Sequence, residues 1–163
     1  MKISILLPYK ENFSPIYAGA VSLFVKDTTN LSSFKKYITV YGNTDLKKVY
    51  KLRYKNILLK KNIVQSGSKL YVDEFLKYEK QHPSDIIEIH NRPNYFHLIN
   101  KSKKKQKIVL YFHNDPLTMT GSRSINDRKK LLDNANKIIF VAFDNIFFLS
   151  FTDLDPVIVK GSL

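Results

Sequence analysis

The chain has 163 residues, of which 44% are hydrophobic, so it can form one domain with a buried core and is not a disordered chain. It has no cysteine, which excludes disulfides, thiolate catalysis and zinc sites built from cysteine. Lysine and arginine total 27 against 14 acidic residues, which gives a net charge of +13. This charge favours an anionic partner such as phosphate, acidic lipid or nucleic acid. The alternative is that the lysines are solvated surface residues and reflect a genome with biased amino-acid usage.

The N-terminal apolar run, Ile3–Leu7, is much shorter than a signal-peptide core and ends at Pro8. No later run approaches the ~18 apolar residues of a membrane span. The sequence therefore predicts a cytoplasmic protein that is not exported.

Strand and helix patterns alternate through the first half of the chain. Apolar or β-branched runs that end at proline or glycine predict strands, and apolar residues at helical spacing predict helices. In chain order we expect a strand over Lys2–Pro8, a helix from Ser14-Pro15 through Thr28, a strand over Phe34–Tyr41, a strand or exposed extended segment over Asn56–Val64, a turn at Ser66–Ser68 and a helix over Tyr71–Tyr78 that Pro83 stops.

The second half continues the alternation. Ser124 and Asp127 resemble a capping box, with aspartate in place of the usual glutamate, and indicate a helix start. In chain order we expect a strand over Asp85–His90, a short helix over Tyr95–Asn100, a central strand over Ile108–His113, a loop over Asp115–Arg123, a helix through Ala135, a strand over Lys137–Ala142, a helix over Asp144–Ser150 and a short strand over Pro156–Val159.

This alternation predicts an α/β fold: a single-domain, Rossmann-like parallel sheet with helices on both faces. Ligands of such sheets bind beyond the carboxyl ends of the strands. The residues that follow each strand are therefore the candidate site residues.

The first of these candidates is Ala18-Gly19-Ala20, at the start of the first helix. Small residues at a helix N-terminus let a phosphate approach the backbone N–H groups, and close packing of helix on sheet is the alternative reading. The pattern is not G-x-G-x-x-G, which argues against a nicotinamide cofactor.

Two further candidates follow two strands that are consecutive in the sequence. His113 follows the central strand with Asn114 and Asp115, and a histidine there can orient or deprotonate a hydroxyl; a structural histidine is the alternative. His90, Asn91 and Arg92 follow the preceding strand, where Arg92 can pair with phosphate or carboxylate or lie on the surface as a solvated cation.

Other site chemistries lack their motifs. The chain has no G-x-S-x-G and no P-loop, and its histidines have no recognised metal spacing. Two basic segments are solvated turns or, if they are neighbours in space, an anion-attracting face. Their members are Lys47, Lys48, Lys51, Arg53, Lys55, Lys60 and Lys61, and Lys101, Lys103, Lys104, Lys105 and Lys107.

Several stretches, in order, resemble the N-terminal domain of GT-B glycosyltransferases of the family 4 type. They are Lys2–Pro8, Ser14–Val25 with Ala18-Gly19-Ala20 where the family often has Gly-Gly-Ala, Asp85–Asn91, Ile108–Asp115 and Asn134–Val141. Two departures are the single glycine at Gly19 and Ala142-Phe143 where the family usually has serine.

The resemblance implies that the chain is the acceptor-binding half of a glycosyltransferase. Such an enzyme transfers a sugar from a nucleotide-sugar to a glycan or a lipid-linked acceptor, as in the synthesis of cell-envelope polysaccharide, and needs no metal or cofactor. By analogy Gly19 and its neighbours lie near the donor phosphates, His113 near the acceptor hydroxyl, and His90 to Arg92 in the acceptor pocket.

In that family the donor is bound by a second, C-terminal domain, and the chain ends at Val157–Leu163, where the linker to it would begin. We therefore expect the donor domain to be absent, and no turnover without a donor-binding subunit or domain. Expected partners are the two substrates, an anionic surface such as the inner membrane face, and a donor-binding subunit or a second copy. A non-enzymatic basic module that binds nucleic acid or another polyanion is the competing hypothesis.

Overall fold

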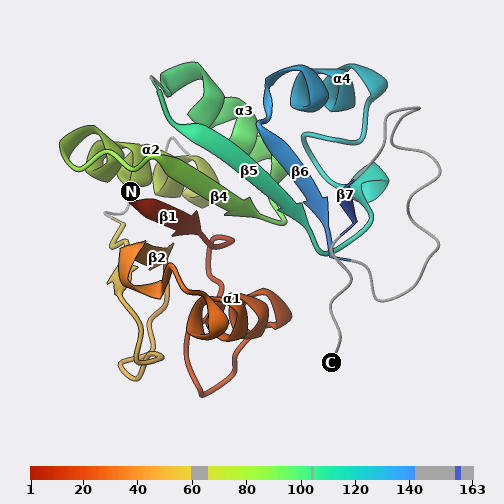
Figure 1. Cartoon of the computed structure of the whole chain (residues 1–163). Coiled ribbons are helices and arrows are strands. Elements are labelled where there is room, and N and C mark those ends of the chain that lie inside the picture. The colour runs from red at the N-terminus through yellow and green to blue at the C-terminus, as the bar shows by residue number, and fades with distance from the viewer. Residues whose placement is uncertain (60–65, 104, 142–156, 159–163) are drawn as a thin grey trace.

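The strands of the chain assemble into one parallel β-sheet, shown in Figure 1. The computed structural model describes residues 1–59, 66–103, 105–141 and 157–158. Within these ranges the sheet has seven strands in the spatial order β3-β2-β1-β4-β5-β6-β7, and every neighbouring pair is parallel. The strands are β1 (Ile3–Leu6), β2 (Ile38–Gly42), β3 (Tyr54–Asn56), β4 (Ile86–His90), β5 (Lys107–Phe112), β6 (Lys137–Phe140) and β7 (Val157–Ile158).

Helices cover both faces of this sheet, as the sequence predicts. Helix α1 (Ala20–Leu31) packs below β1 in Figure 1, whereas α2 (Gly67–Gln81), α3 (Pro93–Ser102) and α4 (Ile125–Asn134) lie on the opposite face. Two short 3-10 helices, η1 (Lys35–Tyr37) and η2 (Pro116–Thr118), stand in the connections. The expected Rossmann-like α/β class is confirmed.

The alternation of side chains along each strand creates two apolar layers. Ile5 and Val40 point toward Val25 of α1, whereas Leu6 and Ile89 point toward α2 and α3 on the other face. Both faces of the central strands are therefore buried, which explains why β1 has no polar alternation apart from Ser4.

The chain order reverses between β1 and β4. From β1 the sheet grows to one side through β2 and β3, and from β4 it grows to the other side through β5 and β6. In an open α/β sheet, ligands bind in the crevice outside the carboxyl ends at such a reversal. The residues after β1, β4 and β5 are therefore the ones expected to line a ligand crevice.

Several predicted boundaries are wrong. The first helix begins at Ala20 and not at Ser14-Pro15, because the Ser14 hydroxyl accepts a hydrogen bond from the Ile16 backbone and closes a local turn. Ser66-Gly67 is a helix start and not a turn, since the Ser66 side chain caps α2 by accepting from the Lys69 backbone.

One predicted strand is shorter than expected, since residues 35–37 of the predicted strand Phe34–Tyr41 form η1. At the sheet edge β3 covers Tyr54–Asn56; residues 57–59 of the predicted strand or extended segment Asn56–Val64 are not strand, and residues 60–64 lie outside the described residues. The predicted helix Asp144–Ser150 lies outside the described residues. Across the described part of the chain, no helix has the length and apolarity to cross a bilayer.

Candidate functional site

The carboxyl ends of β4 and β5 bring together two predicted site residues, His90 and His113. Parallel pairing sets His90 beside Tyr111, and His113 lies two residues further along the chain on the same face. The Nδ1 atom of His90 and the Nε2 atom of His113 are 3.0 Å apart, a hydrogen-bond distance between the two rings. The sequence predicted both histidines as site residues but did not predict that their rings are in contact.

Aromatic rings hold this pair in place. The His90 ring stacks on Tyr111, with centroids 4.4 Å apart and planes tilted by 6°. The rings of Phe24, in α1, and His113 meet edge to face, with their centroids 4.9 Å apart. Because His90 is only 1% exposed, His113 is the member of the pair that stands between His90 and the solvent.

Glu88 extends the pair into a row of three side chains. It lies two residues before His90 on β4, and its Oε2 atom is 3.8 Å from His90 Nε2. That distance is too long for a hydrogen bond, and His90 Nε2 is buried without a partner among the described residues. The carboxylate nevertheless favours the His90 tautomer that carries its proton on Nε2, since that N–H dipole points at a negative charge.

This tautomer determines what His113 can do. If His90 Nδ1 lacks a proton, it accepts the hydrogen bond from His113 Nε2–H. The lone pair of His113 is then on Nδ1, for which no partner is found among the described residues. Burial, and second the nearby His90, lower the pKa of His113 from 6.5 to about 3. At neutral pH His113 is a neutral imidazole whose Nδ1 atom can accept a hydrogen bond.

The side chains of Asn91 and Arg92 both form hydrogen bonds with backbone groups beside the histidine pair. Asn91 has a left-handed conformation with φ of 55°, which asparagine tolerates better than most residues, and its side chain accepts from the His113 backbone N–H at 3.3 Å. The Arg92 guanidinium donates to the Asn91 carbonyl at 2.7 Å. Both residues therefore shape the strand-to-helix turn beside the histidine pair.

Asp115 caps a short helix and has no contact with the His113 ring among the described residues. Its carboxylate accepts from the Leu117 backbone at 2.8 Å and caps η2, so it does not support His113. Asn114 is exposed at the edge of the site.

The predicted phosphate site at Ala18-Gly19-Ala20 already holds a carboxylate. Glu11, from the loop after β1, accepts a hydrogen bond from the Ser22 backbone N–H in the first turn of α1 at 3.1 Å. A Cβ added to Gly19 would overlap this carboxylate. The glycine is thus required by Glu11, and a phosphate at this helix end would have to displace it.

Sequence reasoning missed Glu11 and Glu88, and each had a signal. The first helix has a glycine, Gly19, at its N-cap and no acidic residue in its first turn, so its N–H groups need an acceptor from elsewhere. Glu88 stands between Ile87 and Ile89, both buried, in a strand that is otherwise apolar up to His90. A carboxylate two residues before a histidine on a strand shares its face.

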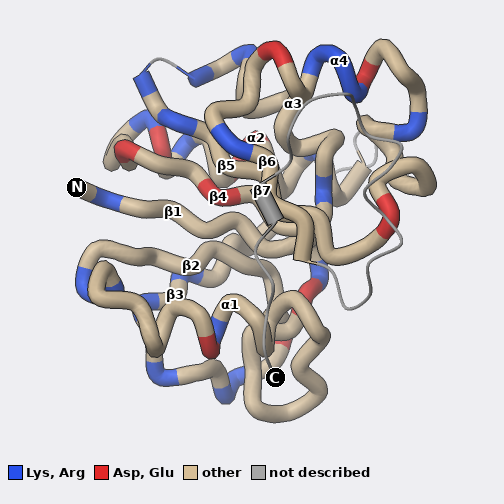
Figure 2. Tube along the Cα trace, turned by 45° about the vertical axis from the view of Figure 1, so that its right-hand side comes forward, with Lys and Arg blue, Asp and Glu red and all other residues tan. Residues whose placement is uncertain are grey.

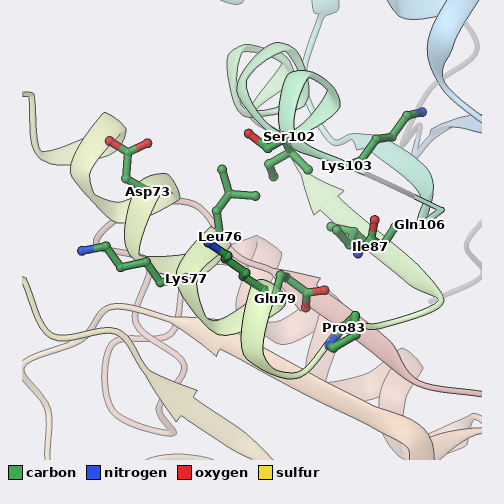
Figure 3. A pocket seen from close by; sticks show the side chains of 11 residues that line it. Asp73, Leu76, Lys77, Glu79, Pro83, Ile87, Ser102, Lys103 and Gln106 are labelled. Atoms are coloured by element: carbon green, nitrogen blue, oxygen red, sulfur yellow. The ribbon is translucent and has the colours of Figure 1, made fainter.

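A cavity of about 440 Å³ lies at the opposite edge of the sheet, between the C-terminal ends of α2 and α3. Figure 3 shows Leu76 and Ile87 against it, with Lys77 and Lys103 at its margins. The buried Glu79 carboxylate at its base is fully engaged, because it accepts from the Ser4 hydroxyl and from both the backbone and hydroxyl of Ser84. These bonds join α2 to β1 and to the start of β4, a structural role.

The described residues contain no group of three or more histidine and acidic side chains arranged to hold a metal ion. No known protein-family model matches the chain, and no curated protein matches it significantly. The interpretation of the site therefore rests on its own geometry.

Proposed function

We propose that the protein is the acceptor-binding half of a glycosyltransferase of the GT-B type, acting on a hydroxyl of a glycan or lipid-linked acceptor. The observation that supports this proposal is the row Glu88–His90–His113 at the reversal point of the sheet. It leaves one neutral imidazole nitrogen, Nδ1 of His113, as a hydrogen-bond acceptor at the edge where α/β proteins bind their ligands.

In this proposal His113 orients the acceptor hydroxyl and does not hold its proton. A group whose pKa is about 3 is too weak a base to remain protonated near neutral pH. As an acceptor, however, it aligns the O–H bond and so directs an oxygen lone pair toward the donor sugar. Positioning of this kind contributes about 10²-fold to a rate when a reacting atom would otherwise be misplaced.

Glu88 and His90 act through His113 and are positioning residues. Glu88 favours the proton on His90 Nε2, and His90 then holds the His113 proton on Nε2. Loss of the Glu88 charge would let His90 adopt its other tautomer and would turn Nδ1 of His90 into a competing donor. The Glu88→Gln variant should therefore weaken the orientation of the His113 ring without altering the packing around residue 88.

The donor must be presented by a second unit, on the same polypeptide or on another one. Glycosyl transfer needs both substrates held together away from water, and the edge of a single sheet provides one wall. The proposal assigns donor-phosphate contact to Ala18, Gly19 and Ala20 only if Glu11 leaves the α1 N-terminus when the donor arrives.

The proposal can be tested by NMR on the histidine side chains. The chain has four histidines, which single substitutions to glutamine would assign. Titration with a panel of neutral oligosaccharides should shift the ring resonances of His113 and His90. His82, exposed at the far end of α2, is the matched control and should not move. A panel in which no glycan shifts His113 would overturn the acceptor role.

An activity test uses the protein together with its donor-binding unit. His113→Gln should lower transfer by about 10²-fold with little change in the acceptor KM, because orientation and not affinity is lost. Glu88→Gln should give a smaller loss in kcat. Full activity of His113→Gln would remove this residue from the mechanism.

A further inference from the structure

Cations gather along the edge of the sheet where the strands begin. Figure 2 shows blue segments of the trace on the side where the N-terminus lies. The first residues of β5 and β6 are exposed lysines, and the segments that lead into the other strands add further exposed cations. The exposed cations of this edge are Lys2, Lys35, Lys36, Lys51, Arg53, Lys80, Lys101, Lys105, Lys107 and Lys137.

The part of this edge around α1 also exposes large apolar side chains. Leu31, the last residue of α1, is 88% exposed, and Phe34, which precedes η1, is 50% exposed. Tyr37 at the end of η1 is also exposed, with the Lys36 ammonium 5.0 Å from its ring centroid. Three large apolar side chains within seven residues of the chain, among cations, are unusual for a surface that meets only water.

A groove of about 570 Å³ adjoins these residues. Its cationic lining is Lys35, Lys36, Lys51 and Arg53, and no acidic side chain lines it. None of the four cations forms an ion pair with another described residue. The groove therefore presents uncompensated positive charge of the kind that binds phosphate.

Leu31 and Phe34 are presented by an ordered turn. The Ser32 backbone N–H donates to Thr29, the Ser32 carbonyl accepts from Lys35, and the Phe34 carbonyl accepts from Tyr37. The Ser32 hydroxyl also accepts from the Phe34 backbone. Because the turn satisfies these backbone groups internally, it can enter a less polar medium without leaving them unpaired.

We propose that this surface, formed by Leu31, Phe34, Lys35, Lys36, Lys51 and Arg53, docks the protein on an anionic lipid bilayer. Leu31 and Phe34 enter the boundary between headgroups and acyl chains, and the groove binds lipid phosphates. Apolar side chains that protrude beside lysines are typical of interfacial membrane binding. Nucleic acid would use the cations but would leave Leu31 without a partner.

Docking at this edge has a consequence for the site. Helix α1 runs from the histidine edge to the opposite edge, so the lipid-facing surface and His113 lie at opposite ends of the strands. A protein docked in this way directs His113 away from the membrane surface. His113 would then reach an acceptor that extends into the aqueous phase. The docking itself does not depend on the proposed function, because vesicle binding requires no turnover.

The first test is flotation of the full chain with vesicles at roughly 0.1 M salt, where charges are screened beyond ~10 Å. We expect binding to vesicles of phosphatidylcholine with phosphatidylglycerol and little binding to phosphatidylcholine alone. Lys35→Glu with Lys36→Glu should weaken binding by at least 10-fold, since each cation contributes about fivefold. The matched control, Lys129→Glu with Lys130→Glu, changes the charge equally at exposed positions of α4, on the opposite face of the sheet from α1, and should retain most of the binding.

The second test exploits the absence of tryptophan from the chain. Phe34→Trp introduces a single fluorophore, whose emission should shift to the blue on addition of anionic vesicles and be quenched by brominated acyl chains. Leu58→Trp is the matched control, since Leu58 is 77% exposed near the carboxyl end of β3, and its emission should not shift.

Three results would overturn the proposal. They are no binding to anionic vesicles, equal loss of binding in both lysine pairs, and an unshifted Phe34→Trp spectrum with vesicles bound. Binding of a generic oligonucleotide that Lys35→Glu with Lys36→Glu abolishes, without any vesicle binding, would assign the surface to nucleic acid instead.

Discussion

The Glu11 carboxylate and the Gly19 Cα are coupled closely enough for a double-mutant cycle to measure the interaction. Glu11→Ala removes a charged acceptor from the Ser22 N–H at the positive end of α1. Loss of a helix cap of this kind costs about 1–2 kcal/mol of unfolding free energy. Gly19→Ala should cost about the same, because the new Cβ forces the carboxylate to leave.

The double variant should be no less stable than either single variant. Gly19 has φ of −78° and ψ of 165°, a conformation that alanine adopts without strain, so its substitution is costly only while Glu11 is present. The two losses should therefore overlap by about 1 kcal/mol or more, whereas independent sites add to within ~0.5 kcal/mol.

Urea unfolding followed by far-ultraviolet circular dichroism measures all four corners of the cycle. Thr28→Ala, at an exposed position near the end of the same helix, is a control that should add to Glu11→Ala. If the Gly19→Ala and Glu11→Ala losses also add, the carboxylate does not occupy the helix end in solution and our account of Gly19 is wrong.

Three further predictions concern the N-terminus of α1, the His113 side chain and the buried Glu79 carboxylate. Inorganic phosphate should raise the Tm of Glu11→Ala more than that of the wild type if the vacated helix end accepts phosphate; equal shifts would count against a phosphate role there. Since folding lowers the pKa of His113 from 6.5 to about 3, the unfolded chain binds the extra proton, and stability should fall by up to about 1.4 kcal/mol per pH unit as the pH drops through that window. His113→Gln should flatten that slope in urea titrations at several pH values, and an unchanged slope would refute the assignment. Glu79→Ala should cost about 2–4 kcal/mol in urea unfolding, because the buried Ser84 N–H loses its acceptor, and a cost below ~1 kcal/mol would show that water replaces the carboxylate.

Local patterns were sufficient for much of the fold. The apolar runs around β1, β4 and β5 predicted buried parallel strands, and Ser124 with Asp127 marked the start of α4, where the Ser124 hydroxyl accepts from the Asp127 backbone. These signals succeed because each depends on residues within a few positions of one another. The alternation of the elements then restricts the sheet to few topologies.

Boundaries failed where a distant residue supplied the missing partner. The start of α1 depends on Glu11, and the short strand β3 pairs only at the sheet edge, so neither is visible in a local window. The candidate site shows the same limit. Its histidines could be placed after two consecutive strands from the sequence, but neither the pairing of those strands nor the contact of the two rings could.

The sequence by itself determined that this protein is a parallel α/β sheet with its polar candidates after the strands, because hydrophobic periodicity is a local property. Only the tertiary structure decided how those candidates act. It brought the Glu88 carboxylate within 3.8 Å of His90 and placed the Glu11 carboxylate at the N-terminus of α1. It also separated the basic edge from the histidine edge by the length of the strands. Those outcomes depend on strand register and helix packing, which relate residues far apart in the chain.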